Sequence, residues 1–191
     1  MEIHWAVARD FESDSRRADW RAGRLAAKRA VAAALGVASL EHLEIDSRAE
    51  SAPRPLFCIS GERQPLDLVV SLAHDDGRAV AAVAAAARGA RIGVDLEREQ
   101  PLPAEHARYF LRAEERSATR ASLLACWALK EAAWKALGLS RSEPLSSPEL
   151  VWRGSELVAL RHAGVEHAVY AELRRPWRGY LAALVVLPEA A

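Results

Sequence analysis

The chain of 191 residues lacks the features that mark several large classes of protein. Its charges balance, with 26 Lys and Arg against 26 Asp and Glu, so it has no basic excess of the kind that general nucleic-acid binders carry. No apolar run reaches the roughly 18–20 residues that a membrane span needs. The opening MEIHWAVARD has no basic-then-apolar signal layout. We therefore expect a cytoplasmic protein that binds neither nucleic acid nor a membrane.

Cysteine is scarce, and several common site motifs are missing. Cys58 and Cys126 lie far apart, which fits buried thiols better than a disulfide framework or a zinc site. Neither GxxxxGK[ST] nor GxGxxG occurs, so a P-loop or Rossmann site is excluded. Ser71 and His74 form a close Ser/His pair, but no GxSxG elbow surrounds them.

Lysine is also rare. The 26 basic residues include only three lysines, Lys28, Lys130 and Lys135, and the rest are arginines. The chain uses arginine wherever it needs a generic surface cation, so two lysines within six positions need a reason. Lysine is a compact charge whose proton can be tuned, whereas the guanidinium is a fixed planar fork.

The composition that remains is that of a globular protein, 51% hydrophobic and 27% charged. Apolar patterns and turn signals predict two units that each run from a strand through a helix to further strands. The expected elements are strands at 2–8, 66–73, 78–87, 91–97, 149–152, 166–173 and 179–187, with helices at 18–35, 104–111 and 120–137. An Asp-Gly step at 76–77 predicts a hairpin, and Gly36 and Gly138 follow the long helices as caps. We predict an α+β fold with halves at 1–89 and 90–191.

The first predicted helix is strongly basic. Between residues 16 and 29, six basic side chains oppose one acid, Asp19. Two interpretations stay open: a solvated helix face, or a face that binds an anion.

Acidic residues gather near the start of the second half. Side chains alternate along a strand, so Asp95 and Glu97 share a face while Val94 and Leu96 point to the core. Gly93 lets another backbone or a ligand come close. Two carboxylates on one face repel unless a cation or water separates them. The alternative is an edge strand that ends in solvated acids.

The second long helix adds a carboxylate and a cation. Glu131 and Lys135 are four residues apart, in the order that gives a surface pair worth about 0.2–0.5 kcal/mol. Trp127 shares their face, so the charges lie beside a bulky apolar group instead. Asp95, Glu97 and Glu131 together suit a hard ion such as Mg²⁺, which prefers oxygen ligands.

With these residues in view, the chain resembles the 4′-phosphopantetheinyl transferases, most closely the monomeric Sfp-type branch. Residues 92–97 (IGVDLE) fit the family pattern (I/V)G(I/V)D.E, and residues 127–135 (WALKEAAWK) fit W..KE...K. Residues 71–74 (SLAH) fit SxSH in part. The pair Arg54-Pro55, and Tyr109-Phe110 followed by Glu114 and Glu115, match further family features.

The resemblance implies a pseudo-two-fold pair of α/β units with the active site between them, acting as a monomer. The substrates would be coenzyme A and an apo acyl or peptidyl carrier protein, whose serine attacks the β-phosphate and releases 3′,5′-ADP. Asp95, Glu97 and Glu131 would hold Mg²⁺ or Mn²⁺. Glu131, or a water on the metal, would help remove the serine proton, and Lys135 would neutralise the phosphate and could protonate the leaving group.

The resemblance also implies which residues bind coenzyme A. Arg54 and His74 match phosphate contacts, and Arg24 and Lys28 are further candidates on the basic helix. Ala73 stands where the family often has serine. One neutral hydrogen bond contributes roughly 0.5–1.5 kcal/mol, so we expect weaker coenzyme A binding rather than lost activity.

Three other functions remain open. The first is a non-catalytic relative of the same fold that binds coenzyme A or a carrier protein. The second is a metal-dependent nuclease, which the neutral net charge disfavours. The third is an interaction module whose acids and lysines are surface charges.

Overall fold

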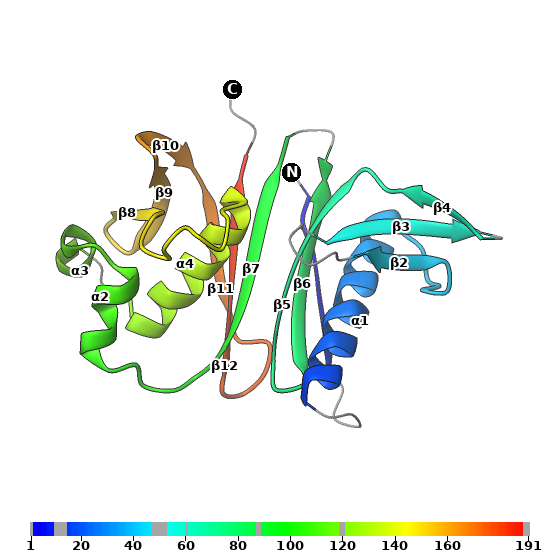
Figure 1. The fold of residues 1–191 in the computed structure, drawn as a ribbon, viewed down its shortest axis with the longest axis horizontal. Coiled ribbons are helices and arrows are strands. Elements are labelled where there is room, and N and C mark those ends of the chain that lie inside the picture. The colour runs from blue at the N-terminus through cyan, green and yellow to red at the C-terminus, as the bar shows by residue number, and fades with distance from the viewer. Residues whose placement is uncertain are drawn as a thin grey trace. The chain divides into compact units, whose positions relative to one another are not determined.

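The chain forms two compact units. The computed structural model describes residues 2–9, 15–46, 53–59, 61–86, 89–118 and 121–188. Contacts divide the chain into Met1–Ile92 and Gly93–Ala191, and each unit combines helices with two three-stranded sheets (Figure 1). The α+β class is thereby confirmed. The boundary falls three residues beyond the one expected after residue 89, and the pseudo-two-fold relation between the halves stays a prediction.

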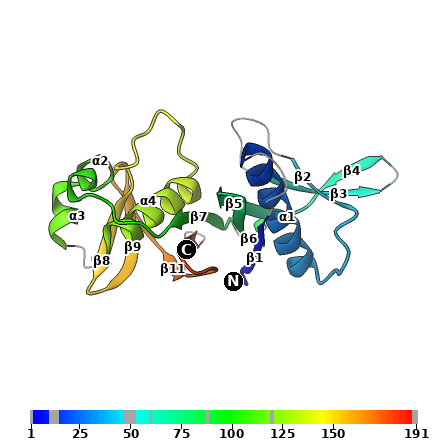
Figure 2. The same ribbon diagram turned by 90° about the horizontal axis from the view of Figure 1, so that it is seen from below.

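Unit 1 places one long helix between two antiparallel sheets. Both ribbon views show α1 in this position (Figure 1, Figure 2), and it packs against β1, β2, β5 and β6. The sheet orders are β1-β6-β5 and β2-β3-β4. The elements are β1 (His4–Arg9), α1 (Ser15–Leu35), β2 (Leu43–Asp46), β3 (Arg54–Ile59), β4 (Glu62–Pro65), β5 (Leu68–Asp75) and β6 (Arg78–Ala85).

Alanine explains how α1 packs so closely on its sheet. Ala22, Ala26 and Ala30 are four residues apart, share one face and are fully buried. Gly36 ends the helix with φ +67°, and Val37 N–H donates to the carbonyl of Ala32 over 3.0 Å. A glycine in the left-handed region is the expected C-terminal cap, so the predicted end of this helix is confirmed.

The β5–β6 hairpin also forms as predicted. Asp76 and Gly77 have φ +50° and +70°, the positive values that a two-residue hairpin turn needs at both central positions. The turn is tied to α1, because Gly77 N–H donates to Asp19 Oδ1 over 2.7 Å. This contact fixes the end of β5, and therefore His74, against the helix.

The strands β2, β3 and β4 were not predicted. They are short, β4 is exposed along its whole length, and Pro55 and Pro65 sit in paired positions. Proline is a signal against a strand interior, and a fully exposed strand has no apolar alternation to detect. These reasons apply to β3 and β4, whereas β2 does alternate apolar and acidic residues (LEID) and was missed because it spans only four residues.

Unit 2 also combines a long helix with two three-stranded sheets. β11, β12 and β7 form one sheet, and β10, β9 and β8 form the other. Helix α4 packs against β12, and alanines on α4 share a core with leucines and valines of β8, β9 and β12. The elements are β7 (Arg91–Arg98), η2 (Ala104–His106), α2 (Ala107–Phe110), α3 (Ala113–Ala118), α4 (Leu123–Leu137), β8 (Glu149–Arg153), β9 (Glu156–His162), β10 (Val165–Ala168), β11 (Tyr170–Arg174) and β12 (Tyr180–Leu187).

Both ends of α4 carry caps. The Ser122 hydroxyl accepts from Ala125 N–H over 3.2 Å, and Gly138 ends the helix with φ +67°. The predicted end is confirmed, whereas the start lies later than residue 120, which falls outside the described residues. No helix in the described part of the chain is both long and apolar enough to cross a membrane.

Three expectations for unit 2 were wrong. The single strand expected at 166–173 is two strands, β10 and β11, which belong to different sheets. The strand β9 and the helix α3 were missed. β9 lies between turns at Gly154 and Gly164, both with positive φ, and the glycines there did not enter the prediction.

Candidate active site

Helix α4 lies against the backbone of β7 at Gly93. A methyl group on this glycine would lie 1.9 Å from the carbonyl oxygen of Ala132 and 2.7 Å from the amide nitrogen of Ala136. No side chain larger than hydrogen fits, so the predicted close approach at Gly93 is confirmed. Ala132 and Ala136 directly follow Glu131 and Lys135, and the contact therefore brings these two residues to β7.

Asp95 is buried on β7, with 5% of its surface exposed. Its Oδ1 accepts from Lys135 Nζ over 2.8 Å, and the same Nζ donates to the Val94 carbonyl over 2.9 Å. The other carboxylate oxygen, Oδ2, is buried and meets no hydrogen-bond partner among the described residues. A buried carboxylate oxygen without a partner is costly, and native structures usually reserve it for a ligand, an ion or a water.

Glu97 lies two residues further along β7 and is half-buried. The Trp127 indole N–H donates to its Oε1 over 2.7 Å, and the Trp127 ring packs edge-on against Phe110 with centroids 5.3 Å apart. Burial raises the pKa of Glu97 to about 7, and the negative charges of Asp95 and Glu131 act in the same direction. Trp127 opposes this rise, because its hydrogen bond favours the carboxylate.

Glu131, on α4, feels the same surplus of negative charge. Burial raises its pKa, the charge of Asp95 raises it further, and Lys135 lowers it. Three carboxylates therefore face one ammonium group. The oxygen donors, the unpartnered Asp95 Oδ2 and the missing positive charge all fit a hard divalent cation. Within the described ranges, however, no group of three or more His, Cys, Asp or Glu side chains is placed to hold a metal ion, so the three-ligand set stays a prediction.

Two of the simpler alternatives do not describe this site. The acids of β7 are not solvated edge residues, because Asp95 is buried and Glu97 is held by Trp127. The Lys135 ammonium group pairs with Asp95 on β7, so it does not serve merely as a surface partner of Glu131.

Four of the five residues expected to contact coenzyme A lie in unit 1, and the fifth, Lys135, lies in unit 2. Arg54 is the exposed first residue of β3. Arg24 is half-buried on α1 with its guanidinium 4.9 Å from the Trp20 ring centroid; burial lowers its pKa, and Asp46 opposes that change. Lys28 follows one turn later and is also half-buried.

His74 is exposed near the end of β5 and lies beside α1. Its Nδ1 is 3.8 Å from Asp19 Oδ2, and a methyl group on Gly23 would lie 3.6 Å from its Cδ2. The imidazole and the helix that carries Arg24 are therefore neighbours. Ala73 is buried in the same strand.

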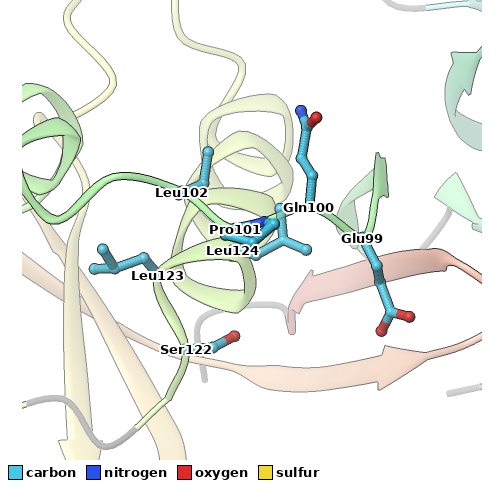
Figure 3. Close-up of a pocket in the computed structure, with 7 residues that line it drawn as sticks. All are labelled: Glu99, Gln100, Pro101, Leu102, Ser122, Leu123 and Leu124. Carbon is cyan, nitrogen blue, oxygen red and sulfur yellow. The ribbon is translucent and has the colours of Figure 1, made fainter.

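An open pocket lies on unit 2 between the segment 99–102, which follows β7, and the start of α4 (Figure 3). It has a volume of about 440 Å³ and begins at Glu99, two residues after Glu97. Its far side is the first turn of α4. Trp127 lies one turn further along the same helix. The lining is mainly apolar and consists of Pro101, Leu102, Leu123 and Leu124, with Glu99, Gln100 and Ser122 as its polar members.

Sequence reasoning missed three contributors. Trp127 was noted as an apolar neighbour and as part of the motif W..KE...K, without a role, yet it binds Glu97. Glu115 and Lys130 form a buried ion pair, with Nζ 2.6 Å from Oε1. The scarcity of lysine and the same motif singled out Lys130, and Glu115 matched a family feature, but neither signal indicated that they pair. No disulfide joins the two cysteines, both of which lie in the described ranges; Cys126 is buried as expected, and Cys58 is only half-buried.

A family model matches most of unit 2. Residues 91–185 match the model described as the 4′-phosphopantetheinyl transferase superfamily. This segment belongs to that superfamily. The match includes Asp95, Glu97, Glu131 and Lys135, and it leaves Arg54, His74, Arg24 and Lys28 outside.

Two further comparisons accompany the superfamily match. One solved structure, the holo-[acyl-carrier-protein] synthase of Thermotoga maritima, is similar with 20% sequence identity and a TM-score of 0.40. The similarity covers 52% of this chain and 64% of that chain, less than two thirds of its length. No curated protein matches the chain.

Proposed function

We propose that the protein is a 4′-phosphopantetheinyl transferase of the two-unit, monomeric Sfp type. It transfers the 4′-phosphopantetheine group from coenzyme A to a serine of an apo acyl or peptidyl carrier protein and releases 3′,5′-ADP. The observation that carries this proposal is the contact of Lys135 Nζ with the buried Asp95 carboxylate, which lies within the superfamily segment. The second oxygen of Asp95, which meets no partner among the described residues, and the adjacent ammonium group suit phosphoryl chemistry, which depends on positioning and charge stabilisation.

Asp95, Glu97 and Glu131 would hold Mg²⁺, or Mn²⁺ in its place. Asp95 Oδ2 has no other partner among the described residues. Burial raises the pKa values of Glu97 and Glu131, the charge of Asp95 raises them further, and a divalent ion would offset that charge. When bound, the ion supplies positive charge to the pyrophosphate of coenzyme A. Trp127 holds the Glu97 carboxylate in place for this role.

Glu131 and Lys135 would move the protons. Burial and Asp95 raise the pKa of Glu131, which makes it a stronger base than an exposed carboxylate, so it can accept the proton of the carrier serine at a carboxylate oxygen. Lys135 uses two of its three N–H donors on Asp95 and Val94. The third donor, which meets no acceptor in the described part of the chain, would bind the transferring phosphate and protonate the leaving 3′,5′-ADP.

Side chains of unit 1 would bind the phosphates of coenzyme A. Arg54, His74, Arg24 and Lys28 supply the cations that the phosphates of coenzyme A need in a neutral protein. The pocket that begins at Glu99 would receive apolar side chains of the carrier protein, because its lining is mainly apolar. We therefore assign the pocket to the carrier protein, and a substitution of Leu123, which lines it, tests this assignment.

The deciding experiment is intact-mass spectrometry of apo carrier proteins incubated with this protein, coenzyme A and Mg²⁺. A gain of one phosphopantetheine mass with the wild type, and none with Glu131→Gln, is the expected result. Coenzyme A binding without a mass gain on any carrier would contradict the transferase proposal and favour the non-catalytic relative. Omission of Mg²⁺ with EDTA present is the matched control for the metal.

A further inference from the structure

A buried ion pair on α4 takes no part in the proposed chemistry. Lys130 is 0% exposed and Glu115, on α3, is 2% exposed. Lys130 Nζ lies 2.6 Å from Glu115 Oε1 and 2.8 Å from Oε2, and it also donates to the carbonyl of Pro148. Lys130 is one of only three lysines in the chain, and it immediately precedes Glu131, a proposed metal ligand.

The hydrogen bonds of this pair are complete and reach three separate segments. The three N–H donors of the ammonium group meet three acceptors. Glu115 also accepts from Arg112 N–H over 2.8 Å and from Leu150 N–H over 2.7 Å. The pair therefore joins α4 to α3, to the end of the loop before β8, and to β8 itself.

Two neighbouring rows of side chains consequently hold α4. Lys130 and Trp134, four residues apart, bind the segment 143–148, since the Trp134 indole N–H donates to the Glu143 carbonyl over 3.3 Å. Trp127 and Lys135 bind β7 from the next row, and Glu131 lies between them in that row. The first row therefore determines how the second is turned toward Asp95.

Small rotations of α4 about its axis displace the side chains that it carries. Side-chain tips lie about 5–6 Å from a helix axis, so a rotation of about 10° displaces a tip by about 1 Å. A misplacement of that size can reduce a rate by about 100-fold. Stability alone does not account for the pair, because well-packed apolar residues often replace a buried ion pair without loss. Hydrogen bonds are directional and therefore fix the rotation of a helix about its axis, whereas apolar contacts have no preferred direction.

We propose that Lys130, held by Glu115 and Pro148, is a positioning residue that sets the rotation of α4 and thereby directs Glu131 toward Asp95 and Glu97. This inference rests on the proposed function, because the value of that orientation lies in metal binding and proton transfer. Lys130 itself touches none of the reacting groups.

The main test is the double variant Lys130→Met/Glu115→Gln. It removes both charges together and leaves an amide that can accept from Leu150 N–H and donate to the Pro148 carbonyl. We expect a folded protein with unchanged coenzyme A affinity and KM for coenzyme A. We expect Mg²⁺ affinity and kcat to fall at least tenfold, together with a shift of the Trp127 indole resonance in a ¹⁵N correlation spectrum. Trp127→Phe identifies that resonance.

A second variant keeps the test decisive if the double variant does not fold. Glu115→Asp preserves the charge pair and shortens the connection by one methylene group, so it should move the Trp127 resonance and weaken Mg²⁺ binding while the fold is retained. The matched control is Arg161→Gln, which removes exposed ion pairs with Glu149 and Glu166 in the same unit. It should leave the resonance and the Mg²⁺ affinity unchanged.

The two proposals can fail separately. A Trp127 resonance and Mg²⁺ response identical to the wild type, in a folded double variant or in Glu115→Asp, would overturn the positioning role. The resonance decides this point even if the wild type transfers nothing to any carrier, a result that would overturn only the proposed function.

Discussion

Replacement of Gly93 by alanine tests whether the contact between β7 and α4 assembles the site. The new methyl group would lie 1.9 Å from the carbonyl oxygen of Ala132. Because Cβ atoms essentially never approach a neighbour within 3.0 Å, α4 must move away by about 1 Å, a displacement that can reduce a rate by about 100-fold. Glu131 and Lys135 precede the two alanines that would be struck, so the displacement falls on the proposed catalytic groups.

The same substitution has a separate effect on stability. Overpacking a well-packed contact costs about 1–3 kcal/mol and sometimes more, which corresponds to about 2–12 °C in Tm for a chain of this length. Thermal melting followed by circular dichroism measures this effect. Turnover is measured by intact mass well below the Tm of the variant, so that loss of activity is not confused with unfolding.

The matched control is Gly23→Ala in α1. The methyl group there would meet the Leu72 side chain at 3.3 Å, and alanine improves helix propensity by about 1 kcal/mol over glycine. This variant should melt no lower than the wild type and should keep its Mg²⁺ dependence. Turnover of Gly93→Ala within threefold of the wild type would refute the argument that the close contact sets the geometry of the site.

Three further predictions concern single side chains. Lys135→Arg keeps the charge but should lose at least about tenfold in turnover, because the larger planar fork does not match a compact ammonium group; near-normal turnover at equal folding would contradict this. The pKa of Glu97 is raised to about 7 from its ordinary 4.5, so its protonated form stabilises the folded state fully below about pH 4.5, and this contribution is lost as pH rises through 7. In EDTA, Tm should therefore fall over that range more steeply for the wild type than for Glu97→Gln, and identical pH profiles would exclude the shift. Leu123→Asp should raise KM for the carrier protein without changing KM for coenzyme A, and equal changes in both would argue against the pocket as the carrier site.

The elements that sequence reasoning predicted are those with local signals. Helix α1 has buried alanines at helical spacing and a glycine cap, and α4 has a cap at each end. The β5–β6 hairpin has an Asp-Gly turn. β7 alternates apolar and acidic residues from Val94 to Glu97, with a glycine before them, although the structure buries every residue from Ile92 to Leu96. Each of these signals acts within a few residues, so no knowledge of distant contacts was needed.

The features that escaped prediction depend on contacts between distant segments. The hydrogen bond from Trp127 to Glu97 joins residues 30 positions apart, and the pair of Lys130 with Glu115 spans 15. The strand expected at 166–173 divides at Val169 because its two parts pair with different neighbours, β9 and β12. Local patterns carry no information about which partner a strand or a side chain will meet.

The unpartnered oxygen of Asp95 has a consequence for how variants of this protein would be selected. In the metal-free protein the three carboxylates repel one another, because one ammonium group offsets only part of their charge. Neutral substitutions at Asp95, Glu97 or Glu131 would relieve that repulsion. A selection for abundance or heat resistance would favour such substitutions, while a selection for turnover would eliminate them. These positions should therefore show opposite preferences in the two selections, which would separate functional residues from core residues such as Val94 without any knowledge of the substrate.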